Sequence, residues 1–153
     1  MEKLKNTKLL GIIGAIVTII GLFLPFATVT AKAFGIKYSE SVTYIQADGV
    51  FVLILTVITL LMIFSDKLSE KVEFFKKLSN VKLVLVPTII SAIILIFDMI
   101  NAADVVGDVS SSLVKAEVSY GIGLWVLWIG LIATAVFPFL YKKSENSTQD
   151  VQE

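Results

Sequence analysis

Four polar residues stand at the edges of long apolar segments, where ionisable groups are unusual. Asp48 precedes one apolar run and Asp98 closes another, with Asn101 and Asp104 about one and two helical turns further along. Oxygen ligands at this spacing can hold a hard cation or carry a proton, so one hypothesis is a cation or proton site formed by these four residues. The simpler interpretation is that Asp48 caps a helix while Asp98 reaches water, and a third is an ion pair with Lys115.

The composition removes most catalytic chemistries. The 153 residues include no His and no Cys, so imidazole acid–base catalysis, thiol catalysis, thiolate metal sites and disulfides are excluded. The sequence contains no glycine-rich phosphate loop, no HExxH motif and no Ser–His arrangement. Thirteen basic and thirteen acidic residues balance, which argues against a globally basic nucleic-acid binder. We expect no enzymatic activity, no cofactor and no nucleic-acid partner.

Hydrophobicity places much of the chain in lipid. Apolar residue types make up 56% of the sequence, compared with about 45–50% in an ordinary soluble domain. A helix needs about 20 apolar residues to cross a hydrocarbon core about 30 Å thick. The pattern predicts an all-α membrane protein, a four-transmembrane-helix bundle forming one domain over residues 1–143, and its expected spans are 9–27, 49–64, 83–100 and 121–141.

Lysine placement predicts how the chain is threaded, because cytoplasmic loops are enriched in positive charge. The two loops expected outside hold only Lys32, Lys37 and Lys115. The other ten lysines lie in the N-terminal segment, the middle connection and the tail: Lys3, Lys5, Lys8, Lys67, Lys71, Lys76, Lys77, Lys82, Lys142 and Lys143. We therefore expect both termini in the cytoplasm.

Aromatic and basic residues flank the fourth apolar segment as interface anchors do. Trp125 and Trp128 fall near its outer end, while Tyr141, Lys142 and Lys143 close its inner end. Amphipathic rings favour the headgroup layer, so this arrangement agrees with the proposed threading.

The first apolar segment also resembles a secretory signal. A basic start, an apolar run and Ala31-Lys32-Ala33 imitate a small-x-small cleavage site. The uncharged run is longer than the usual signal core, and three further spans follow it. An uncleaved first helix is therefore the preferred interpretation.

Small residues recur at helical spacing in two of the spans. One narrow face of the first span and one of the fourth would let another helix approach closely, by packing within the bundle, in a homo-oligomer or against a partner's helix. The residues of these two faces are Gly11, Gly14, Thr18 and Gly21 in the first span and Gly123, Gly130 and Thr134 in the fourth.

The segments between the spans differ in character. Residues 28–48 alternate polar and apolar types on both sides of Phe34-Gly35, which predicts a β-hairpin outside the membrane, and Val114–Tyr120 can add a third strand. Residues 65–82 form a lysine-rich amphipathic connection expected on the inner leaflet, or a docking site for a cytoplasmic partner. The polar tail, residues 144–153, is expected to be disordered.

This topology resembles that of the claudins, although the aromatic-Gly-Leu-aromatic motif and the loop cysteine pair of that family are absent. The segments Leu9–Gly14, Leu24–Phe26, Asp48-Gly49 and Gly121–Gly123 also resemble small four-span proteins of Gram-positive bacteria. The second resemblance implies a bacterial plasma membrane and no particular activity.

These observations lead to two functional hypotheses. The first is recognition of another membrane or extracellular protein through the outer β-rich loop or the small-residue faces, as in an accessory, immunity or envelope-stress component. The alternative is a small oligomeric conduction or transport subunit with its acidic site at the outer mouth.

Overall fold

The structure is a computed structural model that describes residues 2–33, 35–68, 81–109 and 114–149. It is mostly helical, with four α-helices and a small three-stranded antiparallel sheet. The helices are α1 (Glu2–Phe23), α2 (Gly49–Leu68), α4 (Leu85–Val109) and α5 (Ile122–Gln149), and the short 3-10 turns are η1 (Tyr44–Gln46) and η2 (Val81–Val84). The strands are β1 (Pro25–Ala33), β2 (Ile36–Thr43) and β3 (Val114–Tyr120).

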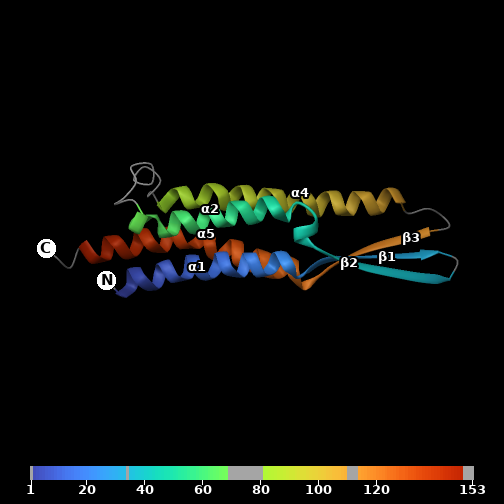
Figure 1. Cartoon of the computed structure of the whole chain (residues 1–153), viewed down its shortest axis with the longest axis horizontal. Helices are drawn as coiled ribbons and strands as arrows, with labels where there is room; N and C mark the ends of the chain where they lie inside the picture. Colours follow the sequence, from blue (N-terminus) through green and yellow to red (C-terminus); the bar gives the residue numbers. More distant parts are fainter. Residues whose placement is uncertain (1, 34, 69–80, 110–113, 150–153) are drawn as a thin grey trace.

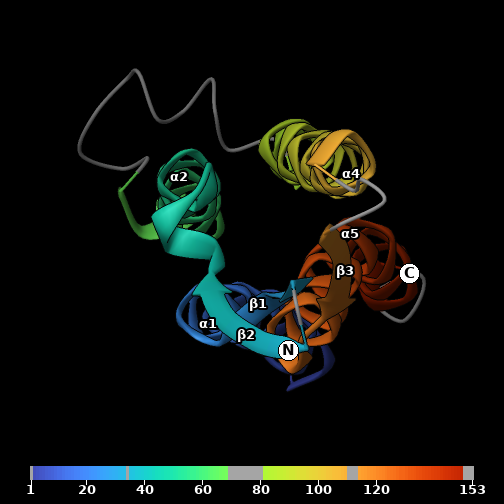
Figure 2. The ribbon, with the colours of Figure 1, turned by 90° about the vertical axis from the view of Figure 1, so that its right-hand side faces the viewer.

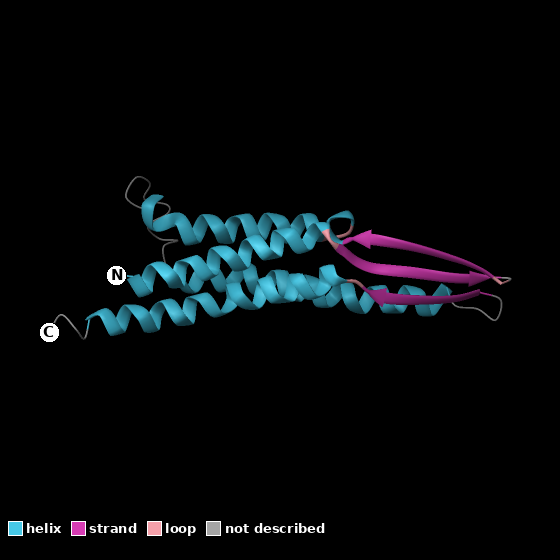
Figure 3. Ribbon diagram, turned by 90° about the horizontal axis from the view of Figure 1, so that it is seen from below, coloured by secondary structure: helices cyan, strands magenta, loops and turns pink. Residues whose placement is uncertain are grey.

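The helices lie side by side, and the sheet extends from one end of the bundle along the same long axis (Figure 1). Both chain termini lie at the opposite end, seen also from below in Figure 3. The end of α2 at Leu68 and the start of η2 at Val81 lie at that same end (Figure 1). The lysine-rich parts of the sequence are therefore attached to one end of the molecule and the sheet to the other.

The helical surface has the reverse of a soluble protein's polarity. Large apolar side chains are exposed along every helix, for example Ile20 at 52%, Ile93 at 60% and Phe139 at 67%. Among the described residues, the buried polar ones all bear a hydroxyl group, and each donates a hydrogen bond to the carbonyl four residues earlier, which for Thr88 belongs to η2 and for the others to the same helix: Thr18, Thr56, Thr59, Thr88, Ser91 and Thr134. Two helices contain apolar stretches long enough to cross a membrane, Asn6–Phe23 and Ile122–Lys142, while Gly49–Phe64 and Leu85–Asn101 are shorter.

The closest helix pair is α1 with α5. A Cβ atom on Gly130 would lie 2.5 Å from the backbone nitrogen of Thr18, and one on Gly14 would lie 2.8 Å from that of Thr134. Both distances are below any normal contact, so only glycine permits this approach. The backbones of α1 and α5 come this close at Gly14 and Gly130 because glycine places no side chain between the two helices.

The remaining residues of the two small-residue faces lie along the same contact. A Cβ on Gly11 would meet Phe137, one on Gly21 would meet Leu127, and one on Gly123 would meet the carbonyl of Leu24, which precedes β1. Both faces are thus used for packing within the chain.

The core concentrates where the bundle meets the sheet. Its largest cluster combines residues from all four helices with the start of the sheet: Leu22, Phe26, Ala27, Tyr44, Val52, Leu95, Leu124, Leu127 and Leu131. A smaller cluster, Ile63, Val84 and Phe137, lies further along the bundle. The sheet is therefore anchored to the helices by the better packed of the two clusters.

The sheet has the order β2-β1-β3, and the hairpin and the third strand expected from residues 28–48 and Val114–Tyr120 are both present. The hairpin turns at Gly35, whose φ of 82° is a left-handed conformation that favours glycine. Alternate residues face opposite sides of the sheet. One face carries mainly hydroxyl and charged groups and the other mainly apolar residues.

Several element boundaries differ from the expected ones. The first helix ends at Phe23, and residues 25–27 belong to β1, because Pro25 has no amide donor and disfavours a helical Leu24. Helix α4 continues past residue 100 to Val109. Helix α5 continues through residues 144–149, which belong to the tail expected to be disordered, and extending an existing helix fixes few further torsions per hydrogen bond gained.

The amphipathic connection is only partly described. Residues 65–68 continue α2 and residues 81 and 82 belong to η2. Residues 69–80, on which the expected lipid-facing stripe depends, lie outside the described residues, as do residues 150–153 of the tail.

Candidate functional site

Two polar regions of the molecule can take part in function: a junction beneath the sheet and the sheet surface itself. The junction is centred on Tyr44, which is fully buried in η1. Its ring lies 4.7 Å from that of Phe26, centroid to centroid, and its hydroxyl donates a short hydrogen bond to the Asp98 carboxylate on α4. Tyr44 therefore ties the base of the sheet to the helix that runs alongside it.

The two acidic residues singled out in the sequence meet at this junction. Asp48, which immediately precedes α2, lies close enough to Asp98 for their charges to interact. The junction thus joins η1 to α4 through the hydrogen bond of Tyr44 and brings the start of α2 beside it.

The environment of Tyr44 keeps its hydroxyl protonated. Burial raises the pKa of Tyr44 far above its usual value of about 10, and its hydrogen bond to Asp98 raises the pKa further. The negative charges of Asp98 and Asp48 act in the same direction. A protonated Tyr44 is the state that can donate to Asp98.

The structure does not bring the other two residues of the expected cation site into this junction. Asn101 is exposed on α4, and Asp104 lies on the same helix with a side chain outside the described part of the structure. Among the side chains that the structure describes, no three His, Cys, Asp or Glu residues are grouped so that they could hold a metal ion.

Sequence reasoning missed Tyr44. Its place in an alternating pattern assigned it to a strand, whereas β2 ends at Thr43 and Tyr44 begins a 3-10 turn. The available signal was Thr43-x-x-Gln46, since the Thr43 amide donates to the Gln46 side-chain oxygen at 3.1 Å. A Thr followed by Gln three residues later is typical of a capped helical turn.

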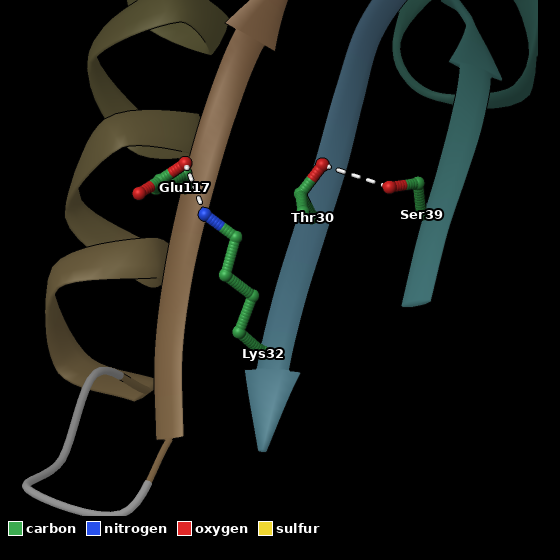
Figure 4. Close-up of polar contacts among 4 residues, drawn as sticks. All are labelled: Thr30, Lys32, Ser39 and Glu117. Carbon is green, nitrogen blue, oxygen red and sulfur yellow. Dashed lines mark hydrogen bonds and ion pairs between the residues drawn. The ribbon is translucent and has the colours of Figure 1, made fainter. Parts of the chain in front are cut away.

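The polar face of the sheet is held by side-chain contacts between strands. Thr28 and Ser41 share a hydrogen bond of 2.8 Å, and Thr30 and Ser39 one of 3.0 Å. Figure 4 shows the second of these contacts beside the ion pair of Lys32 on β1 with Glu117 on β3, whose charged atoms are 3.6 Å apart.

The two edges of the sheet differ. The β3 side is next to α4, where the Tyr120 hydroxyl donates to the Met99 carbonyl at 2.9 Å. The β2 side lies away from α4 when the molecule is viewed from the sheet end (Figure 2). No strand pairs with the outer edge of β2 in the described part of the chain. Two apolar side chains are also exposed there, Ile36 at 74% and Tyr38 at 65%.

The expected interface anchors lie towards opposite ends of α5. Trp125 is exposed and Trp128 half-buried in the first turns, next to the sheet. Towards the other end, the Lys8 ammonium lies 5.4 Å from the centre of the half-buried Tyr141 ring. Lys142 follows it and is exposed, and the side chain of Lys143 is outside the described residues.

Because comparisons with known proteins found no match, a functional assignment rests on these two regions. The chain matches no protein-family model, no curated protein and no solved structure.

Proposed function

We propose that this protein is a four-span integral membrane protein of the bacterial plasma membrane that recognises another protein through the open edge of its outer sheet. In this proposal both termini are cytoplasmic and the sheet is on the outside. The recognised partner is a membrane or extracellular protein that supplies an extended segment. Such a segment would add a strand to the sheet by main-chain hydrogen bonding along β2.

The membrane part of the proposal is supported by the reversed polarity of the helices. Exposed Ile, Val and Phe side chains on all four helices would cost free energy in water and none in lipid. The buried hydroxyls need no water, because each donates to the carbonyl four residues earlier. The lysine distribution supports the orientation, since ten of thirteen lysines fall in segments attached to the end opposite the sheet.

The recognition part rests on one observation: β2 has an unpaired edge with exposed apolar side chains. Proteins usually blunt such edges with proline, a bulge along the strand, a covering element or a charged side chain, and of these β2 carries a charged side chain, Lys37. β2 contains no proline, and the register shift in its pairing lies at the end nearest the bundle, between Pro25 and Ala27. The stretch from Ile36 to Ser41 is therefore a regular template for a further strand.

The conduction alternative has one specific feature in its favour, the proximity of Asp48 and Asp98. It can be separated from recognition with Asp98→Asn in proteoliposomes. A conduction role requires that this variant lose ion-dependent flux. The recognition role requires that capture of a partner at β2 be unchanged.

Recognition at β2 is testable by crosslinking from a single position. A photo-crosslinking amino acid at Tyr38 is expected to form one discrete adduct in native membranes, mapped to an extended segment of the partner. The matched control is Ile93, which is equally exposed but lies on α4 in the proposed lipid zone. Identical adducts from both positions, or none from Tyr38, would contradict the proposal.

A further inference from the structure

Three lysines are aligned across the outer sheet. Lys32 on β1 pairs in register with Lys37 on β2 and with Lys115 on β3. Neighbouring strands are about 4.8 Å apart, and like charges placed directly opposite each other destabilise a sheet. We call Lys37, Lys32 and Lys115 the lysine row.

At Lys32 and Lys37, the row carries positive charge that the carboxylates of the described residues balance only in part. In the described residues, Lys32 has an acidic partner in Glu117, whereas no carboxylate lies within ion-pair distance of Lys37. Lys37 is exposed and occupies the edge strand. The charge is thus presented at the edge proposed for recognition.

The membrane's own phosphates are too far away to neutralise this charge. Lys32 is seven residues along β1 from Pro25, and at about 3.3 Å per residue the row is roughly 23 Å from the start of that strand. The strands extend along the long axis beyond α1, α2 and α5, and only α4 continues beside them (Figure 1). Charges interact weakly beyond about 8 Å at physiological salt, so the compensating anion must come from outside the lipid surface.

A second copy of the chain in the same membrane is a poor occupant of the edge. Two copies would be related by an axis along the membrane normal, which is also the direction of the strands. Their β2 strands would then run parallel with equal residues at equal height. A twofold axis between them also turns the second sheet over, so the face of one copy that carries Lys37 would continue into the face of the other that carries Ile36 and Tyr38, which sets charged beside apolar side chains.

We infer that the segment recognised at β2 belongs to a different protein and has an apolar–acidic–apolar pattern. This inference rests on the proposed function. A strand added beside β2 places one residue next to Lys37 and its two neighbours on the opposite face, beside Ile36 and Tyr38. An acidic side chain next to Lys37 extends the lysine row with the opposite charge. Apolar side chains at the two neighbouring positions cover the exposed apolar surface of Ile36 and Tyr38.

The test uses thiol exchange with the full-length protein in nanodiscs of zwitterionic lipid. Because the chain has no cysteine, Ser41→Cys on β2 supplies a single attachment point, and Glu40→Cys is a second position if the first disturbs the sheet. The probes are capped peptides with a central Val-Glu-Val, Val-Gln-Val or Val-Lys-Val, and the cysteine of each is supplied as a mixed disulfide with a small thiol, which is the leaving group when the protein thiolate attacks. A fourth probe is the Val-Glu-Val peptide with alternate backbone amides methylated.

We expect the Glu peptide to be captured about fivefold more than the Gln peptide, and the Lys peptide least, which is the scale of one favourable cross-strand charge pair. Lys37→Glu should reverse the order of the Glu and Lys peptides. Lys142→Glu, which changes an exposed lysine at the other end of the bundle, should leave the order unchanged. The preference should shrink at 1 M salt.

The failures are distinguishable. Equal capture of the three peptides, with capture lost on amide methylation, would overturn the acidic preference while edge pairing stands. Capture that survives amide methylation would overturn both. If inorganic polyphosphate binds in a manner dependent on Lys37 while no peptide preference exists, the ligand is a polyanion and the inference is wrong.

Discussion

The helical bundle and the outer sheet have opposite surfaces. Helix α4 exposes Ile93 to 60%, whereas the sheet exposes lysines and hydroxyl groups on one face and pairs them between strands, as in Lys32 with Glu117. The bundle buries its hydroxyls and satisfies each with the carbonyl four residues earlier. The proposed membrane location assigns the two regions to different solvents, lipid for the bundle and water for the sheet, and the Tyr44 junction is where the two regions meet.

The largest effect is expected from the backbone contact between α1 and α5. Gly130→Leu would force a side chain against the Thr18 backbone, so we expect a loss of about 3 kcal/mol of unfolding free energy or no folded protein. Unfolding in mixed detergent micelles measures this. Ile129→Leu, at a neighbouring exposed position, should change stability by less than about 0.5 kcal/mol. Equal effects would show that the glycine contact is unimportant.

The next effect concerns the junction between the two regions. Tyr44→Phe removes the donor to Asp98 inside the core and should cost about 1–3 kcal/mol. The matched control is Tyr120→Phe, which removes an exposed hydrogen bond to Met99 and should cost about 0.5 kcal/mol. Hydrogen exchange along β1 should rise in the first variant only. A larger loss from Tyr120→Phe would contradict this role of Tyr44.

The junction also predicts an alkaline limit to stability. Folding raises the pKa of Tyr44, so its contribution is complete below the unfolded value of about 10 and declines as the pH rises above it. Wild-type stability should therefore fall more steeply between pH 10 and 12 than that of Tyr44→Phe, by at most about 1.4 kcal/mol per pH unit. Parallel pH profiles of the two proteins would contradict this prediction.

The smallest effect is expected on the polar face of the sheet. Lys32→Gln breaks the exposed pair with Glu117, which should cost no more than about 0.5 kcal/mol. It also relieves repulsion within the lysine row, so stability should change little in either direction. Thermal unfolding of Lys32→Gln and the wild type at low and high salt measures this change in stability. A loss of unfolding free energy above about 2 kcal/mol would show that the pair is a main support of the sheet.

Local patterns were sufficient to predict the strands and the small-residue faces. Alternation on both sides of Gly35 depends on strand geometry alone, and the spacing of Gly11, Gly14 and Thr18 depends on helix geometry alone. The end of the first helix was also predictable from Pro25, but an apolar run extending past it concealed the boundary.

The junction was not predictable in the same way. The similar depths of Asp48 and Asp98 follow from counting residues, but their proximity depends on how α2 and α4 are rotated about their axes. The rotation is set by packing among all four helices. The burial of Tyr44 depends on a turn that interrupts the alternating pattern.

The most direct test compares the solvent around the two regions. Spin labels at Ile93→Cys and Tyr38→Cys would occupy positions of nearly equal exposure, 60% and 65%, in a chain with no other cysteine. In lipid vesicles, the label at position 93 should collide with oxygen and not with a water-soluble nickel chelate, and the label at position 38 should do the reverse. Ready collision of the nickel chelate with the label at position 93 would contradict a bundle surrounded by lipid.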